Sequence, residues 1–384
     1  MKKCKICGSQ KIEKISPLCS NMKIMGANFS EGNCDIVSCK ECGFVYNQYE
    51  NADQTDFDEY YKSNNSKTVN YYDIFSKNLA DEYFEHIFSN IEDYINKDSK
   101  ILDVAGGYGE LAKYLVDKGF PNVTVLEMKD ECIEYIKKNG LNVMEGNLLN
   151  IVVKEQYDLV VCSHDLEHFI DVDTALKKIM ELTNDKGHIY VEIPNIEEYS
   201  KLDRAPYHFL TYEHVCHFSE NTLRNIERKF SLKMIYLKKY IKCNDYPCLY
   251  TVFEKSNDTM NVVRDTTSIE SMRIYIEKCR NEIQKSLRKY EESQEPLILW
   301  GIGASTAQLL NGCFDQCNVI QLVDSNKSRQ GIKFQIGIKE MKVKPPTDIC
   351  NKEAKIFILP TAYKESIKQS IRNYGLENDI VSLK

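Results

Sequence analysis

Two pairs of cysteines near the N-terminus have the spacing of a metal site. Cys4 and Cys7 form one Cys-x-x-Cys pair, and Cys39 and Cys42 form a second. Four thiolates in two such pairs suit a tetrahedral zinc ion, and four protein ligands leave no open position for catalysis. Thiols in a small domain, or a redox pair, are the alternatives. We expect a structural zinc ion that holds together an N-terminal lobe over residues 1–50.

A glycine turn follows the first buried strand of the central region. Residues 101–104 have the apolar pattern of a strand, and Gly106, Gly107 and Gly109 come next, just before a helical pattern. Glycine lets the backbone approach a ligand closely, and a helix N-terminus offers free N–H groups. The acid within this motif, Asp103, favours a ligand with a cationic end.

A second acid, Glu127, ends the next strand, and a carboxylate there can accept both hydrogen bonds of a ribose diol. With the glycine turn, it resembles the S-adenosylmethionine site of class I methyltransferases. A Rossmann-type turn for another nucleotide, or a turn with no ligand, is the alternative. The resemblance implies a cofactor site that also includes Ala105, Met128, Asn147 and Ser163.

A histidine-rich segment lies between residues 207 and 219. Three of the seven histidines fall in it, and Glu213, His214 and His217 precede Ser219, a predicted helix N-cap. Histidine is the side chain best suited to take a proton near neutral pH. A packed loop with satisfied histidines, or a histidine–cysteine metal site, is the alternative. We expect a functional role for at least one of these histidines.

Polar residues also follow the predicted strands of residues 158–163 and 188–193. His168 lies shortly after the first of these strands and Asn195 after the second. The carboxyl ends of strands are where doubly wound sheets bind ligands. Both residues are therefore candidates for the site.

The elements that position these residues alternate between strand and helix patterns from residue 100 to about residue 256, which implies a parallel sheet. Segments 233–237 and 249–253 suit a closing antiparallel pair. We expect an α/β protein, whose class I methyltransferase Rossmann-like core lies between an N-terminal zinc-binding lobe and a smaller C-terminal Rossmann-like α/β domain. The expected parts are residues 1–50, 51–99 (helical and tyrosine-rich), 100–256 (core), 257–295 (helical linker) and 296–384 (C-terminal domain).

The tyrosine-rich segment contributes Tyr60, Tyr61, Tyr71 and Tyr72. Tyrosines at helical spacing are usually amphipathic packing. Their place just before the cofactor domain also makes them candidates to roof a substrate site, and the spacing does not decide between the two.

The C-terminal domain has its own glycine turn, which includes Gly303 and Ser305, and a strand that ends in Asp324. Thr306 stands where a dinucleotide-binding turn would have its third glycine, which disfavours NAD. A contribution of this turn to a substrate pocket is the favoured interpretation.

Composition excludes several classes of protein. The 384 residues carry a net charge of −7, which argues against a mainly nucleic-acid-binding protein. No apolar run approaches a membrane span, and the N-terminus lacks the apolar core of a signal peptide, so we expect a cytoplasmic protein. Fifteen cysteines are too dilute for a disulfide scaffold.

The order of the parts resembles that of the bacterial nucleotide-sugar C-methyltransferase family, over nearly the whole chain. The run from Cys39 to Tyr46 resembles the family's second cysteine knuckle, and turns at Gly303 and Asp324 resemble its C-terminal domain. Two positions depart from the pattern: Thr211 replaces a tyrosine, and Ala105 replaces a glycine of the cofactor turn.

The resemblance implies methylation of a carbon beside the keto group of a nucleotide-activated deoxysugar. His214 would be the base, Glu213 would orient it, and His168 would hydrogen-bond the keto oxygen. The candidates for binding the sugar nucleotide are Tyr60, Tyr61, Tyr71, Tyr72, Asn195, His217, Gly303 and Ser305. An O-methyltransferase on the same frame, or a non-catalytic binding protein, is the alternative.

Overall fold

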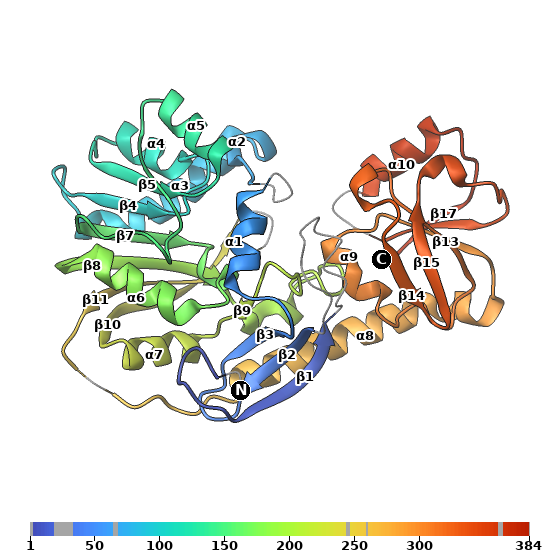
Figure 1. Cartoon of the computed structure of the whole chain (residues 1–384), viewed down its shortest axis with the longest axis horizontal. Coiled ribbons are helices and arrows are strands. Elements are labelled where there is room, and N and C mark those ends of the chain that lie inside the picture. Colours follow the sequence, from blue (N-terminus) through green and yellow to red (C-terminus); the bar gives the residue numbers. More distant parts are fainter. Residues whose placement is uncertain are drawn as a thin grey trace.

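The computed structural model describes residues 3–18, 34–63, 68–242, 246–258, 260–359 and 364–383, without the side chains of residues 304 and 305. Figure 1 shows a larger body that contains the central sheet and, beside it, a smaller α/β domain. Helix α8 (Thr267–Ser293) runs from the larger body to the smaller domain. It falls within the predicted helical linker, and its buried apolar residues, among them Ile269, Met272, Ile276 and Ile283, recur at three- and four-residue steps.

The central sheet has seven strands. Strand β11 runs in the direction opposite to that of the other six. Chain order reverses between the neighbouring strands β4 and β7, so a crevice opens at their carboxyl ends. In spatial order the strands are β10 (Leu232–Lys242), β11 (Tyr246–Lys255), β8 (Thr183–Pro194), β7 (Tyr157–Ser163), β4 (Ile101–Val104), β5 (Val123–Glu127) and β6 (Asn142–Glu145).

Helices cover both faces of this sheet. One face packs against α3 (Lys77–Ile91), α4 (Glu110–Asp117) and α5 (Asp130–Lys138), whose apolar residues form one buried cluster with the strands. The other face packs with α6 (Val172–Leu182) and α7 (Glu220–Lys229) in a second cluster. Two short helices, α1 (Gln54–Lys62) and α2 (Tyr71–Ile74), precede α3. The short 3₁₀ turns of this body are η2 (Glu92–Tyr94), η3 (Leu166–His168) and η4 (Ile196–Lys201).

The N-terminal lobe is a small antiparallel sheet of β1 (Ile12–Leu18), β2 (Cys34–Cys39) and β3 (Val45–Tyr49). A fourth strand, β9 (Cys216–His217), joins its edge through β3. The sequence predicts the lobe but not this strand, which comes from the histidine-rich segment. The lobe is therefore built directly onto the candidate site.

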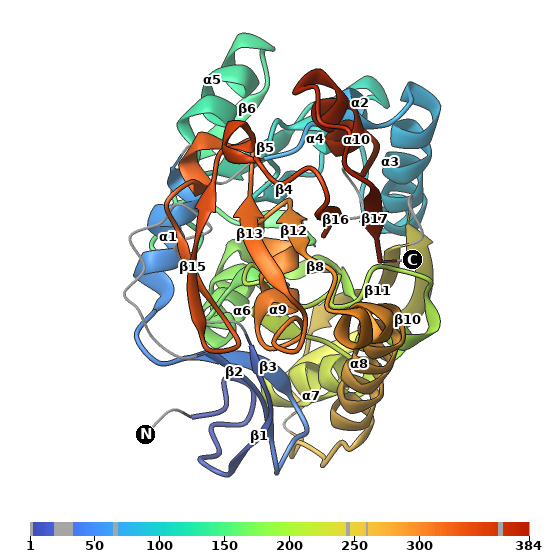
Figure 2. The same ribbon diagram turned by 90° about the vertical axis from the view of Figure 1, so that its right-hand side faces the viewer.

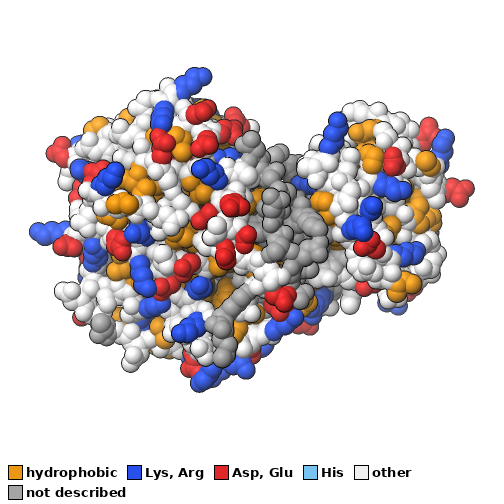
Figure 3. Space-filling model, in the orientation of Figure 1, with side chains coloured by type: hydrophobic (Ala, Val, Ile, Leu, Met, Phe, Trp, Pro, Cys, Tyr) orange, Lys and Arg blue, Asp and Glu red, His pale blue; other side chains and the backbone are white. Residues whose placement is uncertain are grey.

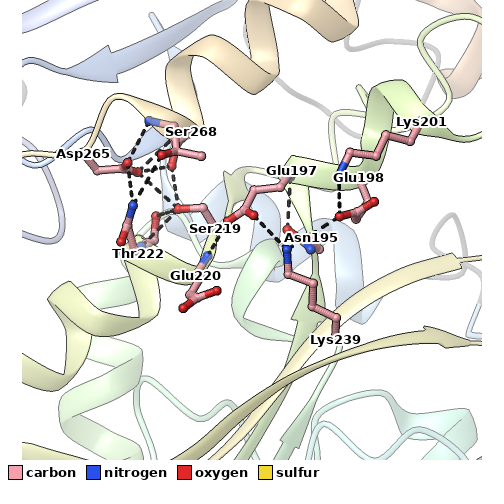
Figure 4. A network of polar contacts seen from close by, with 12 residues as sticks. Asn195, Glu197, Glu198, Lys201, Ser219, Glu220, Thr222, Lys239, Asp265 and Ser268 are labelled. Atoms are coloured by element: carbon pink, nitrogen blue, oxygen red, sulfur yellow. Dashed lines mark hydrogen bonds and ion pairs between the residues drawn. The ribbon is translucent and has the colours of Figure 1, made fainter.

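The starts of α7 and α8 share a network of polar contacts (Figure 4). Ser219 caps α7 by accepting a hydrogen bond from the Thr222 N–H at 3.1 Å, as predicted. The Asp265 carboxylate accepts hydrogen bonds from the hydroxyls of Ser268 at 2.6 Å and Ser219 at 3.3 Å. Gly43 of the N-terminal lobe packs against Asp265, because a Cβ there would lie 2.1 Å from the Asp265 carbonyl oxygen.

The C-terminal domain is a six-stranded sheet with its own glycine turn after β12, as predicted; Figure 2 shows this domain in front of the larger body. Its elements are β12 (Leu297–Trp300), α9 (Ala304–Leu310), β13 (Val319–Val323), η5 (Lys327–Arg329), β14 (Lys333–Ile336), β15 (Lys339–Lys344), η6 (Pro346–Asp348), β16 (Lys355–Ile358), α10 (Lys364–Asn373) and β17 (Ile380–Ser382).

Basic and acidic side chains are interspersed over the face shown in Figure 3. Within the described ranges, none of the helices combines the length and the apolar character that crossing a membrane requires.

Candidate active site

A cavity of about 410 Å³ lies at the carboxyl ends of β4, β5 and β7. Its wall includes the glycine turn and the end of β5, and also α1, η3 and the loop before β9. Glu213 and His168 thus border the same space as the glycine turn and Glu127, whereas His214 lies next to Glu213 outside the wall.

The glycine turn lies against a buried acid. Asp103 is 4% exposed, and its Oδ2 has no hydrogen-bond partner in the part of the chain that the structure describes. A Cβ on Gly106 would lie 2.3 Å from that oxygen, so only glycine fits there. Burial, with the charges of Glu110 and Glu127, raises the pKa of Asp103 to about 8. A cationic group of a ligand could pair with Oδ2 of Asp103, which has no other partner among the described residues.

Glu127 is fixed by the backbone around it. Its Oε2 accepts a hydrogen bond from the Gly107 N–H at 3.0 Å, and its Oε1 accepts from the N–H groups of Met128 and Lys129, both at 2.8 Å. Burial raises the pKa of this carboxyl group, while the three N–H groups favour its ionised form. The remaining lone pairs of the carboxylate suit a ribose diol.

The other predicted cofactor residues divide into two groups. Ala105, Met128, Asn147 and Ser163 line the cavity. Ala105 has a φ of 48°, so it takes the left-handed conformation that a glycine would adopt without strain. Gly109 is not part of the wall; it caps the start of α4 with a φ of 76°.

His168 is held at the edge of the cavity. Its Nδ1 lies 2.8 Å from the Glu213 carbonyl oxygen and 3.0 Å from the Tyr61 hydroxyl. Its Nε2 faces the Glu167 carboxylate at 4.0 Å. The ring therefore has a fixed orientation, with Nδ1 occupied.

Glu213 does not orient His214 as the sequence suggested. Its carboxylate accepts a hydrogen bond from the Tyr60 hydroxyl at 2.6 Å, and its backbone carbonyl receives His168. His214 instead has its Nδ1 3.4 Å from the Tyr246 hydroxyl, and its ring centre lies 5.2 Å from that of His168. Loss of hydration and the neighbouring His168 lower the pKa of His214 to about 3, so the ring is neutral at pH 7.

The predicted substrate residues lie in different places. Tyr61 and Tyr71 line the cavity, whereas the Tyr72 hydroxyl bonds Asp81 near the surface. Asn195 is fully buried and caps η4, and Gly303 lies in the C-terminal turn against Arg329. The Ser305 side chain lies outside the described residues.

His217 is fully buried in β9 and is absent from the cavity wall. Burial lowers its pKa to about 3, and neither ring nitrogen has a hydrogen-bond partner among the described residues. The prediction that His217 lies in a substrate site is therefore wrong for this cavity.

Sequence reasoning missed a pair at the cavity: His164, which lines it, and Glu192, which is buried. The His164 imidazole bridges two carboxylates: its Nε2 lies 3.0 Å from Glu192, and its Nδ1 lies 3.3 Å from Glu167. Glu192 also accepts hydrogen bonds from the hydroxyls of Tyr190 and Tyr83. The position of His164 at the end of a predicted strand was the available signal.

The four cysteines of the N-terminal lobe converge. Cys4 and Cys42 have their sulfurs 3.5 Å apart, those of Cys7 and Cys39 are 3.4 Å apart, and all four lie within 4.8 Å of one another. Tetrahedral zinc with bonds of about 2.3 Å needs sulfurs roughly 3.8 Å apart. The donor set and its spacing fit zinc.

Residues 76–237 match the family model of a methyltransferase domain. A 110-residue stretch is 32% identical to the glutamyl-tRNA reductase of Thermodesulfovibrio yellowstonii and covers 28% of this chain and 25% of that protein. A 110-residue match to the ubiquinone biosynthesis O-methyltransferase of Rickettsia bellii is 28% identical and covers 27% of this chain and 45% of that protein. The chain thus spans less than half the length of either relative.

Among solved structures, an S-adenosylmethionine-dependent methyltransferase from Clostridium acetobutylicum is 14% identical, with a TM-score of 0.37, over 53% of this chain and 99% of that one. The match to the family model and the strand order agree: residues 76–237 are a methyltransferase domain with the Rossmann-like fold of class I S-adenosylmethionine-dependent enzymes.

Proposed function

We propose that this chain is an S-adenosylmethionine-dependent methyltransferase that methylates a carbon beside the keto group of a nucleotide-activated sugar. The observation that carries the proposal is a single cavity that joins two features. Asp103 and Glu127 lie at one part of its wall, and His168 and Glu213 lie at another. A cofactor that is cationic at one end and has a ribose suits the first pair, and proton chemistry suits the second.

When bound, S-adenosylmethionine supplies an electrophilic methyl group on a positively charged sulfur. Asp103 would hold its ammonium group, Glu127 its ribose hydroxyls, and the Gly106–Gly107 backbone would lie against it. The cavity around the cofactor would also be lined by Met128, Asn147 and Ser163.

Carbon methylation requires that a proton leave the carbon beside the keto group. The neutral His214 ring would accept that proton at Nε2, because its Nδ1 faces Tyr246. His168 would hydrogen-bond the keto oxygen through Nε2 as negative charge develops there, since its Nδ1 is occupied by Glu213 and Tyr61. The carbon would then take the methyl group that bound S-adenosylmethionine supplies, and the proton removed from the carbon would stay on His214.

The N-terminal lobe would hold one zinc ion through Cys4, Cys7, Cys39 and Cys42. The sulfur spacing supports this assignment. With four protein ligands, the ion would stabilise the fold of the lobe rather than act in the reaction.

The test is incubation with labelled S-adenosylmethionine and a panel of nucleotide-activated keto sugars, followed by NMR of the product. A new carbon–methyl bond, and exchange of the proton beside the keto group with deuterated solvent, are expected. A methyl ether without exchange would replace this proposal by O-methylation, which the O-methyltransferase relative favours. Absence of cofactor binding in calorimetry would exclude both and leave a non-catalytic binding protein.

A further inference from the structure

The loop that carries Glu213 and His214 has no regular secondary structure, yet its backbone is held tightly. Five consecutive carbonyl oxygens, those of residues 211–215, each accept a hydrogen bond from outside the loop. Four of these hydrogen bonds come from strand β3 of the N-terminal lobe, and the fifth comes from the His168 ring.

The contacts from β3 are short and buried. The Tyr49 hydroxyl donates to the Tyr212 carbonyl at 2.7 Å. The Asn47 Nδ2 donates to the His214 carbonyl at 3.0 Å, and the Asn47 backbone N–H donates to the Val215 carbonyl at 2.7 Å. Asn47 is 2% exposed and Tyr49 is 4% exposed, so water does not compete for these carbonyl groups.

We propose that Asn47 and Tyr49 are positioning residues that set where the His214 ring lies relative to His168. The role of His214 as the base rests on the proposed function; the positioning itself does not. The Glu213 carbonyl, which receives His168, lies between carbonyls that β3 fixes on both sides. A shift of β3 would move the loop that carries His214 and the Glu213 carbonyl that holds the His168 ring, so the spacing of the two rings depends on the β3 contacts.

The same strand offers a matched control. Tyr46 is 6% exposed, lies on β3 opposite Cys216, and has a hydroxyl without a hydrogen-bond partner in the described part of the chain. Tyr46→Phe and Tyr49→Phe are the same chemical change on one strand. Only Tyr49→Phe removes a donor to the loop. Asn47→Asp keeps the side-chain shape but places a carboxylate oxygen against the His214 carbonyl.

We expect kcat to fall by about tenfold in Tyr49→Phe, the factor that loss of one hydrogen bond to a catalytic loop can produce. In Asn47→Asp it should fall by about a hundredfold, the scale of a misplaced reacting group. The affinity for S-adenosylmethionine should stay within about twofold, because the glycine turn and Glu127 are untouched. Tyr46→Phe should match the wild type in both kcat and cofactor affinity.

A second readout does not depend on activity. In protein labelled with ¹⁵N-histidine, the ring signals of His168 and His214 should shift in Tyr49→Phe and Asn47→Asp and stay in place in Tyr46→Phe. Equal kcat values for Tyr49→Phe and Tyr46→Phe, or unchanged ring signals in both loop variants, would overturn the proposal. If the wild type methylates no sugar but the ring signals shift as expected, the positioning stands and the proposed function fails.

Discussion

Binding of S-adenosylmethionine should release a proton from Asp103, which gives the affinity a defined pH dependence. This carboxyl group is buried and lacks a hydrogen-bond partner at Oδ2 within the described residues. Burial and two neighbouring acids raise its pKa to about 8, so it is mostly protonated at pH 6.5. An ammonium group placed against it favours the ionised form and lowers that pKa.

The pH dependence of the dissociation constant is set by the release of a single proton. Below about pH 8, each unit of rising pH should lower the dissociation constant by about tenfold, because binding releases one proton from Asp103. The trend should level off near pH 8, where the carboxyl group is already ionised. It should then reverse, because a free α-amino group titrates at about 7.7–8.0 and loses the charge that Asp103 binds.

The same group affects the stability of the cofactor-free protein in the opposite direction. An unfolded aspartate has a pKa of about 3.9, so between about pH 4 and pH 8 the folded protein holds a proton that the unfolded chain has lost. The contribution of Asp103 to the free energy of unfolding therefore falls as pH rises from about 4 to about 8. Asp103→Asn should remove this component of the pH dependence in urea unfolding.

Calorimetric titration at pH 6.5, in two buffers with different ionisation enthalpies, counts the protons released. We expect about one proton for the wild type and close to none for Asp103→Asn. S-adenosylhomocysteine, which has the same ammonium group without the sulfonium, should release the same proton. Asp165→Asn is the matched control, since Asp165 also lines the cavity with an Oδ2 that has no partner among the described residues. Proton release that survives in Asp103→Asn and disappears in Asp165→Asn would refute the reasoning.

Further predictions concern the ribose site, the base and the N-terminal lobe. Glu127→Ala should weaken S-adenosylmethionine binding by about 1.5–3 kcal/mol in calorimetry, the value of hydrogen bonds to a charged acceptor; an unchanged dissociation constant would place the ribose elsewhere. His214→Asn should reduce turnover by about a hundredfold or more and keep cofactor affinity, whereas normal turnover would move the base to another residue. Gly43→Ala should lower the free energy of unfolding by about 1–3 kcal/mol more than Gly8→Ala, as both glycines have positive φ but only Gly43 would clash, with Asp265; equal losses would contradict this. Cys39→Ser should lose about one zinc per chain by metal analysis, and a metal-free wild type of equal stability would exclude the site.

The core was predictable because its strands are short apolar runs that end in glycine or an acid. Strand β4 has the predicted bounds, and β5 includes the predicted terminal Glu127. The closing pair is longer than predicted. Strand β10 has exposed lysines at its centre, Lys238 and Lys239, so the apolar pattern stops early, while pairing with β11 extends the strand.

The candidate site was predictable only in part, because a sequence lists strand ends without giving the register between strands. His164 and Glu192 are far apart in the chain. In the sheet, however, Ser163 pairs with Glu192, and the His164 N–H donates to the Glu192 carbonyl at 2.8 Å, which places the two side chains together. The same limit explains Glu213: its neighbour in sequence is His214, but its carboxylate meets Tyr60, from a helix more than a hundred residues earlier. Adjacent residues in a loop point in different directions, so the Glu-His pair indicated where proton chemistry could occur but not which partners would orient the base.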